Sequence, residues 1–507
     1  MEKFDIVLVS VPWTVSESPT ASLSVLKACV MEAGFDCKTI DFNIRFQNSS
    51  KDSEQNRSLG EYFLVGENQV LEHEARQLAK GWANEIIQYQ ADWVGISSFC
   101  YQNNRALRLL CDELRHLSTS KIVVGGAGLI QGGLQTSANK SKNLGRSLLD
   151  DNLCDYYIRG EGDVALPELM KGNTDYPGIN SDFYKQTTDI GSFPMPNFDD
   201  YNFEEYSQNR MPITFSRGCV RKCTFCDIHE HWPKYTFRKG EEVAKEMIML
   251  HEKYGIRKFG FTDSLINGAL REFNVFIEIM AKFNQSLRAE DRLTYEGQFI
   301  VRKKQFHKEK FWKDIKDSGA ELLWLGVETG SDQVRDDMDK DFANSDLDYS
   351  MEMIRKYDLN VAFLIIVGYP TETEEHFQQT MEMFDRYRES ASTNIRYVVV
   401  SLMSILPNTP VSRQSEELGL VVDDKQEVNW ISLSNPGNTL EARLDRLNRL
   451  VDQLDRLGYT ISDSALQEFR SIEAMVIGNI EKLKARMRIL QKMRKGNGRS
   501  RTDTIVV

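Results

Sequence analysis

Short apolar runs alternate with longer amphipathic segments over residues 1–174. The apolar runs cover residues 4–12, 37–42, 93–99, 121–128 and 156–162. Apolar residues at helical spacing cover residues 23–31, 70–89, 105–117 and 164–170, and a polar insertion precedes the second of these helices. Unbroken apolar runs are typical of strands buried on both faces of a sheet. We therefore predict an α/β domain with a doubly wound, flavodoxin-like parallel sheet, whose ligand lies at the carboxyl ends of the strands.

Strand and helix patterns alternate again over residues 203–410. Strands are expected at residues 213–216, 258–262, 293–300, 322–326, 361–367 and 397–405. Helices are expected at residues 241–254, 273–283, 308–318, 345–357 and 374–387. About six strand–helix repeats predict a partial (β/α)6 TIM-like barrel, with its site at the carboxyl ends of the strands.

The remaining segments follow other patterns. Residues 175–202 have no strand or helix period and are punctuated by prolines at positions 177, 194 and 196, which predicts a linker. Residues 411–507 predict a C-terminal helical region, because leucines over residues 440–457 step by three and four. A second helix is expected at residues 464–494. We expect the leucine stripe of the first helix to pack on the barrel or on a second copy of the chain.

Composition and charge narrow the functional classes. The 507 residues are 41% hydrophobic and 27% charged, which fits two or three globular domains. The net charge of −12 argues against a nucleic-acid surface, and the basic stretch 482–501 is interpreted as a solvated helix face and tail. No apolar run reaches the roughly 18 residues that span a bilayer. Since residues 1–12 also lack a signal-peptide pattern, we expect a cytoplasmic protein without membrane contact.

Three of the eight cysteines share one short loop, in the sequence SRGCVRKCTFCDIH at residues 216–229. Cys219, Cys223 and Cys226 form a C-x3-C-x2-C array, so three thiolates can reach one metal cluster. A structural zinc site or a closed iron–sulfur site uses four protein ligands. Three ligands leave one metal position open for an exogenous ligand. The other five cysteines lie in expected strands or helices and are interpreted as core residues.

The neighbours of the array leave a second interpretation open. Arg217, Arg221 and Lys222 add positive charge, which we expect to favour thiolate over thiol. However, His229 or His231 could complete a zinc site with the cysteines, or the three cysteines could be unrelated core residues.

The array resembles the cluster motif of the radical S-adenosylmethionine superfamily, which has this spacing and commonly an aromatic residue before the third cysteine, here Phe225. The resemblance implies a 4Fe-4S cluster whose open iron binds the amino and carboxylate groups of S-adenosyl-L-methionine. One electron from the reduced cluster would then cleave this cofactor to a 5'-deoxyadenosyl radical.

Further stretches of the second half match this family. Arg238 in YTFRKGEEV matches a recurrent arginine that would contact the cofactor carboxylate. GFTDSLIN occupies the place of the segment that meets the methionine amino group, with Asp263 and Ser264 as its candidates. Glu328 in LGVETGSD matches the G-x-E-[ST]-G-S turn near the ribose and methionine end. Gly368 in VGYPTETEE belongs to the loop close to adenine, in which a threonine replaces a usual glycine.

The first half resembles the cobalamin-binding domain of the branch that includes class B methyltransferases. The motifs GISSF, VVGGAG and RGEGD stand in that family's order. They place candidate cofactor-binding residues at three turns: Ser97, Ser98, Gly125, Gly126, Gly160 and Glu161. Glycines let a bulky ligand approach the backbone, and hydroxyls can donate to it. The D-x-H-x-x-G signature is absent, so we expect cobalamin to bind base-off, without a protein histidine on cobalt.

The sequence therefore supports a cobalamin-dependent radical enzyme that methylates an unactivated carbon. Ring formation or rearrangement on the same cofactors is the first alternative. A methylthiotransferase acting on RNA or protein is the second, and a non-catalytic cobalamin or S-adenosylmethionine sensor is the third. We expect a small-molecule or natural-product-like substrate and a reducing partner such as flavodoxin or ferredoxin. The catalytic residues and the oligomeric state are not predicted.

Overall fold

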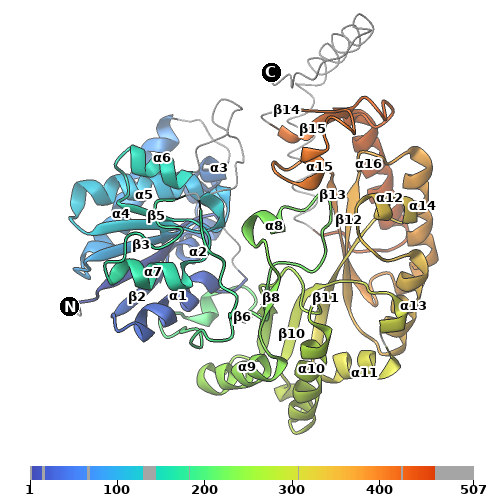
Figure 1. Ribbon diagram of the computed structural model, residues 1–507, viewed down its shortest axis with the longest axis horizontal. Coiled ribbons are helices and arrows are strands. Elements are labelled where there is room, and N and C mark those ends of the chain that lie inside the picture. Colours follow the sequence, from blue (N-terminus) through green and yellow to red (C-terminus); the bar gives the residue numbers. More distant parts are fainter. Residues whose placement is uncertain are drawn as a thin grey trace, which may run out of the picture.

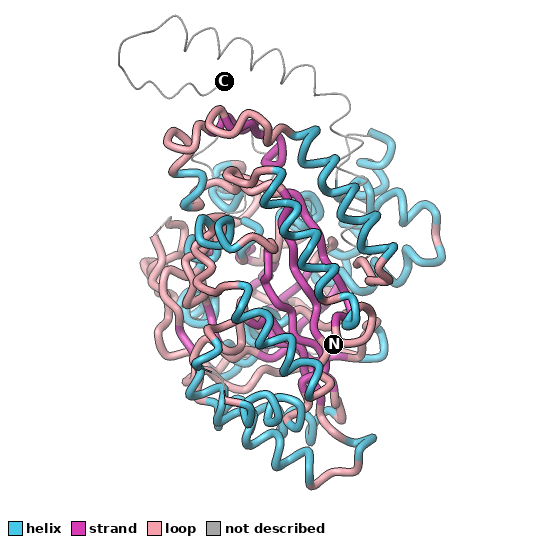
Figure 2. The backbone as a smooth tube through the Cα atoms, turned by 90° about the vertical axis from the view of Figure 1, so that its right-hand side faces the viewer, coloured by secondary structure: helices cyan, strands magenta, loops and turns pink. Residues whose placement is uncertain are grey.

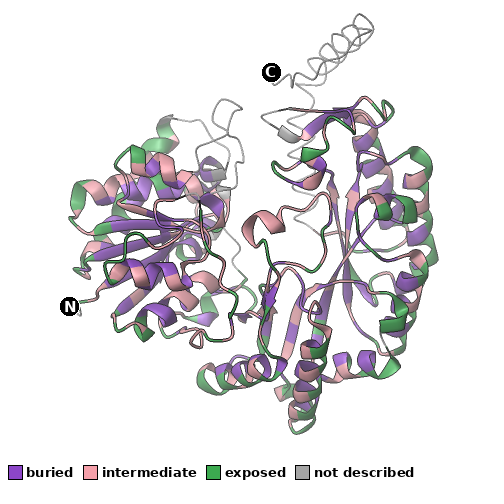
Figure 3. Ribbon diagram, viewed as in Figure 1, coloured by how far each residue is buried: buried purple, intermediate pink, exposed green. Residues whose placement is uncertain are grey.

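Two parallel sheets from different halves of the chain form the molecule (Figure 1). The computed structural model describes residues 3–13, 17–64, 69–129, 144–181, 183–306, 308–423 and 426–462. Buried positions concentrate on the strands and on the helix faces that cover them (Figure 3). The expected helix at residues 464–494 and the basic stretch at residues 482–501 lie outside the described residues.

The N-terminal sheet has five parallel strands in the order β2-β1-β3-β4-β5. Its strands are β1 (Ile6–Ser10), β2 (Cys37–Asp41), β3 (Trp93–Ser97), β4 (Lys121–Gly125) and β5 (Tyr156–Ile158). This is the flavodoxin-like order, in which the direction of winding reverses between β1 and β3. The predicted fold is confirmed, and a ligand is expected outside the carboxyl ends of these strands.

Helices cover both faces of this sheet. They are α1 (Ala21–Glu32), α2 (Phe42–Asp52), α3 (Glu54–Leu64), α4 (Gln69–Ile87), α5 (Asn104–Leu117), α6 (Leu144–Asp150) and α7 (Gly162–Met170). Helices α1 and α7 pack on one face and α4 and α5 on the other. The polar insertion forms α2 and α3, which the apolar pattern does not predict. Their buried Phe42, Phe46 and Phe63 are spaced among polar residues and form an aromatic cluster with Trp82 of α4.

The second sheet has six parallel strands in the order β13-β12-β11-β10-β9-β6. Its strands are β6 (Arg210–Ile213), β9 (Lys258–Phe261), β10 (Thr294–Phe299), β11 (Ala320–Glu328), β12 (Val361–Val367) and β13 (Ile395–Leu402). The helices on its outer face are α9 (Gly240–Tyr254), α10 (Leu270–Gln285), α11 (Glu309–Asp317), α13 (Asn344–Lys356) and α14 (Glu374–Arg386). Figure 2 shows the strands in magenta, running side by side with helices around them. The partial barrel is confirmed.

Short elements surround the carboxyl ends of the barrel strands. They are β7 (Ser216–Arg217), β8 (Thr236–Phe237), α8 (Ile228–His231) and α12 (Asp332–Asp337). Strands β7 and β8 pair antiparallel and flank the three-cysteine loop.

The chain after the barrel is not entirely helical, contrary to the prediction. It forms α15 (Pro410–Arg413), an antiparallel hairpin of β14 (Leu420–Asp423) and β15 (Gln426–Ser432), and then α16 (Leu440–Arg456). The prediction of the leucine-rich helix is confirmed. The hairpin escapes prediction because it breaks the strand–helix alternation that ends with the barrel, although its buried residues Leu420, Trp430 and Ile431 lie in short apolar runs. Trp430 packs beside Tyr369 and Val334, close to the cysteine loop residue Phe225.

Gly126, in the turn after β4, packs closely against Ser98, in the turn after β3. Its φ is +108°, and a Cβ there would lie 2.2 Å from the carbonyl oxygen of Ser98. The glycine is therefore required by the close approach of two protein turns. Gly172, after α7, has a φ of +94°, but a Cβ added there would have nothing within 4 Å, so this residue supplies a matched control.

We predict that Gly126→Ala lowers the free energy of unfolding by about 2–5 kcal/mol, because positive φ and steric overlap add. Gly172→Ala should cost only the φ contribution, about 1–2 kcal/mol. Urea unfolding followed by circular dichroism measures both. Equal losses for the two variants would contradict the steric explanation.

Candidate active site

The cysteine loop follows β7 at the mouth of the barrel. Cys223 is buried, and Cys219 and Cys226 are half-buried. Gly218 begins the loop with a φ of +81°, and the Cys226 N–H donates to the Cys223 carbonyl at 3.1 Å. The Arg221 N–H points at the Cys219 sulfur, 3.4 Å away. The structure thus brings the three predicted ligands onto one compact loop.

Contacts from distant segments fix this loop at Thr224, between the second and third cysteines. The Thr224 N–H donates to the Met338 carbonyl at 3.1 Å, and the Val411 N–H donates to the Thr224 carbonyl at 2.8 Å. The Thr224 hydroxyl lies 2.7 Å from the Tyr369 hydroxyl. The loop conformation therefore depends on α12, on the loop after β12 and on the chain after the barrel.

Burial dominates the electrostatics of the three thiols. It raises the pKa of Cys223 to about 11 and that of Cys226 to about 12, and it raises the pKa of Cys219 as well. The expectation that nearby cations favour the thiolate is outweighed, although Lys340 and Arg221 act in that direction. Deprotonation of these cysteines must therefore accompany metal binding, as is usual for thiolate ligands.

The two histidines of the zinc interpretation have other contacts. His229 Nε2 lies 2.7 Å from the Arg221 carbonyl oxygen, and His231 Nε2 lies 3.6 Å from an Asp227 carboxylate oxygen. Within the described ranges, no three Cys, His, Asp or Glu side chains converge on a single metal ion. An iron–sulfur cluster does not need such convergence, because each thiolate binds a different iron. The donor set therefore fits a cluster with three protein ligands.

A buried ion pair lies beside the cysteine loop. Glu328, at the end of β11, accepts a hydrogen bond from Lys340 at 2.8 Å, and both side chains are at most 9% exposed. The Lys340 ammonium also lies 5.9 Å from the ring centre of Phe225. A Cβ at Gly326 would contact both partners at less than 3 Å, so the glycine makes room for the pair. The sequence predicts Glu328 but provides no signal for Lys340, which stands between two aspartates.

Asp263 has a structural role that differs from the predicted one. Its carboxylate accepts hydrogen bonds from the backbone N–H groups of Phe215 and Ser216 and from the Ser216 hydroxyl. It is 4% exposed, and burial raises its pKa to about 7. Asp263 thus anchors the strand that enters the cysteine loop. Its neighbour Ser264 does line the cavity described below.

Arg238 is also occupied within the protein. It makes two hydrogen bonds to Glu246, at 3.0 and 2.7 Å, and one to the Thr214 carbonyl at 3.1 Å. A bidentate, nearly buried pair of this kind already uses the donors that a cofactor carboxylate would need. The predicted contact of Arg238 with the cofactor is therefore not supported by its placement.

Arg302, after β10, is a cation that the sequence does not single out. Its guanidinium donates to the carbonyls of Asn267 and Gly268 at 2.7–3.2 Å, and it is within electrostatic reach of the Cys219 thiol. Among the described residues, no carboxylate lies within ion-pair distance of it. By contrast, carboxylates pair with Arg217, Arg221, Arg238 and Lys340 around the same loop. Arg302 therefore differs from the other cations near the cysteine loop in forming no ion pair within the described part of the chain, and this difference depends on the three-dimensional fold.

The loop after β12 is held by the C-terminal segment. Gly368 has a φ of +91°, and a Cβ there would overlap the Arg443 side chain at 2.1 Å. The Gly368 N–H donates to Glu372 at 2.8 Å, and Asn438 donates to the Tyr369 carbonyl at 2.8 Å. Glu372 is 1% exposed and pairs with Arg446 at 3.4 Å. Gly368 therefore shapes a loop that reaches the cysteine loop through Tyr369.

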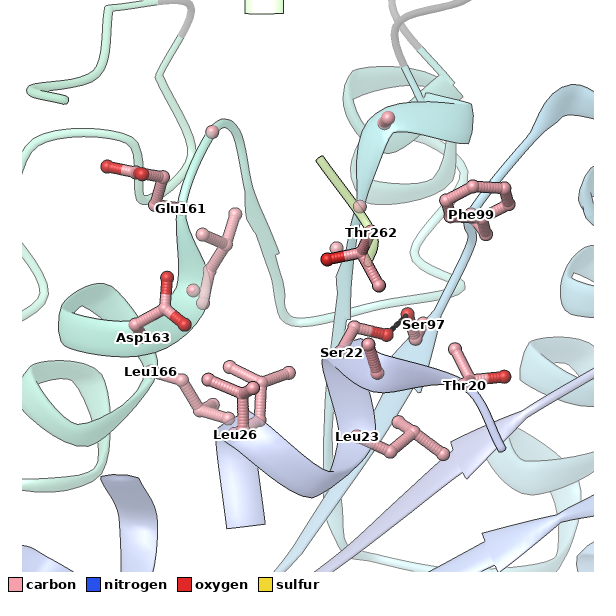
Figure 4. Close-up of a pocket in the computed structure, with 18 of the residues that line it drawn as sticks. Thr20, Ser22, Leu23, Leu26, Ser97, Phe99, Glu161, Asp163, Leu166 and Thr262 are labelled. Atoms are coloured by element: carbon pink, nitrogen blue, oxygen red, sulfur yellow. Dashed lines mark hydrogen bonds between the residues drawn. The ribbon is translucent and has the colours of Figure 1, made fainter. Parts of the chain in front are cut away.

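A cavity of about 430 Å³ lies between the N-terminal sheet and the start of the barrel. Its walls come from α1, from the turns after β3, β4 and β5, and from β6, β7 and the segment after β9. Figure 4 shows Leu23 and Leu26 of α1 and Leu166 of α7 on its apolar side. Ser97 lines it, with its hydroxyl 3.1 Å from that of Ser22. The volume is in the range of cofactor and small-molecule sites.

Of the residues predicted at the three turns, all except Ser98 line the cavity. Gly125 and Gly126 line the cavity, and a Cβ at Gly125 would make only ordinary contacts, so the backbone there is open to a ligand. Gly160 also lines it, but a Cβ there would lie 2.2 Å from the Tyr184 ring. Ser98 is outside the lining, contrary to the prediction. Its hydroxyl is buried and contacts the Asn104 side chain at 2.9 Å.

Glu161 reaches across the cavity wall to the cysteine loop. Arg217, two residues before Cys219, donates to Glu161 at 2.6 Å and to both carboxylate oxygens of Asp163 at 2.7 and 3.1 Å. Glu161 is therefore part of an ion-pair cluster and is not a free cofactor ligand. The cavity walls fit a large, mostly apolar group bound without a histidine from the N-terminal domain.

Comparison with known proteins agrees with this geometry. Residues 213–384 match the model of the family described as the Radical SAM superfamily. The structure of the radical S-adenosylmethionine methyltransferase TsrM from Kitasatospora setae, with tryptophan and a cofactor analogue, aligns with a TM-score of 0.61 at 16% identity, over 97% of this chain and 100% of that one. The structure of OxsB with aqua-cobalamin and S-adenosylmethionine gives 0.60 at 17% identity, over 84% and 64%.

Two curated relatives match over shorter spans. An uncharacterized methyltransferase of Pyrococcus horikoshii is 24% identical over 248 residues, 45% of this chain and 52% of that protein. A tRNA-2-methylthio-N(6)-dimethylallyladenosine synthase of Paenarthrobacter aurescens is 25% identical over 272 residues, 52% and 46%. The chain spans about half the length of these relatives.

Residues 213–384 thus match the Radical SAM superfamily, and the whole chain has the fold of the TsrM and OxsB structures. Within the described residues, no helix combines the length and the apolar character needed to cross a membrane.

We predict that replacing Cys219, Cys223 or Cys226 with Ser reduces the iron content after anaerobic reconstitution to a small fraction of the wild-type value, because each thiolate holds one corner of the cluster. His229→Ala should retain the iron, since its ring contacts the loop backbone. Cys154→Ser, in the N-terminal core, is the matched control. Zinc in place of iron, or iron loss in His229→Ala, would contradict the assignment.

The pKa of the buried Glu372 is raised to about 7 by burial. The folded state therefore keeps a proton that the unfolded state loses above about pH 4.5. Stability contributed by this group is highest below that pH and falls as pH rises toward 7. We predict that Glu372→Gln removes about 2 kcal/mol of the loss in unfolding free energy between about pH 5 and pH 7. Parallel urea titrations of both proteins measure this difference, and identical pH slopes would refute it.

Proposed function

We propose that the protein is a cobalamin-dependent radical S-adenosylmethionine enzyme that transfers a methyl group to an unactivated carbon. The observation that carries the proposal is the cavity walled by both domains. It adjoins the carboxyl edge of the N-terminal sheet on one side and the strand that leads into the cysteine loop on the other. A ligand at the sheet edge would therefore be a direct neighbour of the cluster region.

Three thiolates and one vacant iron position suit the S-adenosylmethionine chemistry of the family. When bound, the reduced cluster and S-adenosylmethionine supply a 5'-deoxyadenosyl radical, and a corrinoid supplies the methyl group. The chain's own contribution is positioning. Asp263 fixes the entry of the cysteine loop, and Thr224 fixes its centre. Glu328 and Ser264 lie at strand ends on the side where S-adenosylmethionine would bind.

Arg302 is our candidate for the carboxylate of S-adenosylmethionine. It is half-buried, its guanidinium is oriented by two backbone carbonyls, and burial together with the Arg221 charge lowers the pKa of that guanidinium. A guanidinium that is already oriented and has no carboxylate partner among the described residues can accept a carboxylate at little reorganisation cost. Arg238, by contrast, would have to give up Glu246 first.

Cobalamin at the sheet edge is supported by the cavity and by the fold. The open backbone at Gly125, the serine hydroxyl at position 97 and the apolar faces of α1 and α7 line the same space. Residues 12–20 contain no histidine, so binding would be base-off with no protein ligand on cobalt from this loop. His231, from the cysteine-loop side, also lines the cavity.

The substrate and the partners follow from the cavity and the chemistry. Beside a corrinoid, the apolar walls and the hydroxyls of Ser22, Ser97 and Thr262 suit a small-molecule or natural-product-like substrate. Reduction of the cluster requires a one-electron donor such as flavodoxin or ferredoxin. The net charge of −12 disfavours a nucleic-acid substrate.

Ring formation or rearrangement on the same cofactors is the main alternative, since the cavity does not distinguish it from methyl transfer. A methylthiotransferase would need a second cluster in the N-terminal domain. Cys29, Cys37, Cys111 and Cys154 are buried in that domain's core, and burial raises the pKa of each thiol. Cys100 is the exception to the expectation of five core cysteines, because it is half-buried in the turn after β3. One half-buried thiol does not supply the three ligands of a second cluster, which disfavours this function. Release of 5'-deoxyadenosine distinguishes the enzyme from a sensor without catalysis.

The test is anaerobic reconstitution with iron, sulfide and hydroxocobalamin, followed by reduction with S-adenosylmethionine present. We expect about four irons and one corrinoid per chain, and release of 5'-deoxyadenosine. A cluster without bound corrinoid would overturn the cobalamin part of the proposal. A corrinoid without 5'-deoxyadenosine would overturn the radical part.

We predict that Arg302→Gln raises the Kd for S-adenosylmethionine about tenfold or more, because a charge-assisted contact to the carboxylate is lost. Arg302→Lys should recover part of the affinity. In Arg238→Gln the Kd should change far less than in Arg302→Gln, while the free energy of unfolding falls. Calorimetric titration of the oxidised, cluster-loaded protein measures the Kd, and the reverse order of the two arginines would restore Arg238 as the contact.

A further inference from the structure

The ion-pair cluster of Arg217, Glu161 and Asp163 joins segments that are far apart in the sequence. Arg217 lies on β7, two residues before the first cysteine of the loop, whereas Glu161 directly precedes α7 and Asp163 lies in the first turn of that helix. Their side chains are 15%, 5% and 8% exposed. Figure 4 shows Glu161 and Asp163 on the same side of the cavity, at the start of α7.

The contacts of Arg217 fix the orientation of its guanidinium group. Arg217 binds both oxygens of Asp163 with its two terminal nitrogens, at 2.7 and 3.1 Å, and reaches Glu161 at 2.6 Å with one of them. The other oxygen of Glu161 accepts the N–H of Thr187, in the linker. The guanidinium carbon also lies 5.4 Å from the ring centre of Phe193, again in the linker. A planar fork held on three sides fixes orientation as well as distance.

The position of this cluster relates the cavity to the cysteines. Arg217, Glu161 and Asp163 all line the cavity, and only Gly218 separates Arg217 from Cys219. A ligand that fills the cavity therefore lies against the same residues that hold the start of the cysteine loop. Because buried charges tolerate the loss of a partner poorly, the three side chains must move together or not at all.

We infer that Arg217 is a positioning residue that fixes the separation between the cysteine loop and the ligand in the interdomain cavity. It does so by binding the first turn of α7 in two directions while its backbone leads into Cys219. The inference deepens the proposed function, because it rests on that function for the identity of the cavity ligand and of the cluster. We call the contacts of Arg217 with Glu161 and Asp163 the clamp; they connect β7 to the start of α7 whatever ligand the cavity binds.

The experiment measures the separation spectroscopically in the cluster-loaded, full-length protein. Hydroxocobalamin is added and reduced with dithionite to the cobalt(II) form together with the cluster. Both centres are then paramagnetic, so the cobalt signal in electron paramagnetic resonance is broadened according to the distance between cobalt and the cluster.

The variants are Arg217→Gln, which removes the charge, and Arg217→Lys, which keeps the charge but loses the two-pronged guanidinium contact. Arg76→Gln breaks a half-exposed pair with Asp112, away from the cavity, and is the control.

We expect one well-defined broadening in the wild type and in Arg76→Gln. Arg217→Gln should bind hydroxocobalamin about tenfold more weakly or worse, and at saturation its broadening should be lost or spread over many values. Arg217→Lys should fall between the two, and it serves as the test if Arg217→Gln does not fold. A purely structural role would lower stability without changing the broadening. Broadening and affinity like those of the wild type in both variants would overturn the inference.

A second measurement separates this inference from the proposed function. If the wild type binds no hydroxocobalamin, the proposed cofactor is wrong, and the clamp is tested by limited proteolysis within the linker, residues 175–202. Loss of the clamp should then speed cleavage in Arg217→Gln severalfold over the wild type and Arg76→Gln. An unchanged cleavage rate would overturn the clamp as well.

Discussion

The structure depends on holding a short cysteine loop in one conformation from outside. A loop of eight residues from Cys219 to Cys226 contains little that could fold by itself, and burial keeps its thiols protonated until a metal replaces the protons. Its shape is imposed by Asp263 at its entry, by Arg217 toward the N-terminal domain and by the Thr224 contacts to Met338, Tyr369 and Val411. A ligand-binding loop fixed in this way is already organised before the cofactor arrives.

The same contacts explain why the chain needs all of its parts. The segment from the hairpin to α16 holds the loop after β12, because Asn438 binds the Tyr369 carbonyl and Arg446 pairs with Glu372. Arg443 in turn donates to the Asn438 carbonyl, and the loop carries Tyr369 to Thr224. On the opposite side, the β5–α7 turn holds Arg217. The cysteine loop thus receives support from both ends of the chain, and the cavity lies where the two halves meet.

The architecture could be predicted from the sequence because both sheets are encoded in repeating apolar runs, and the cluster ligands could be predicted because their spacing is distinctive. Individual polar roles were less predictable. Arg238 and Asp263 match family positions, yet Arg238 binds Glu246 and Asp263 accepts from the Ser216 backbone. These partners are distant in the sequence or have no motif, so they can be identified only from the fold. Arg302 and Lys340 belong to no recognisable motif. Lys340 is identified by its ion pair with Glu328, and Arg302 by the lack of an ion pair within the described residues. The α2–α3 insertion escaped prediction because its few large apolar residues stand among polar ones, and the hairpin escaped it because it breaks the strand–helix alternation.

The central claim is that three thiolates hold a cluster with one iron open to S-adenosylmethionine. The most direct test is electron–nuclear double resonance on the reduced, reconstituted protein with S-adenosylmethionine labelled with ¹⁵N at its amino group. We predict a hyperfine coupling from that nitrogen to the cluster, and its replacement by a ¹⁴N coupling when unlabelled S-adenosylmethionine is supplied instead. A reduced cluster that shows no ¹⁵N coupling at saturating cofactor would contradict the claim.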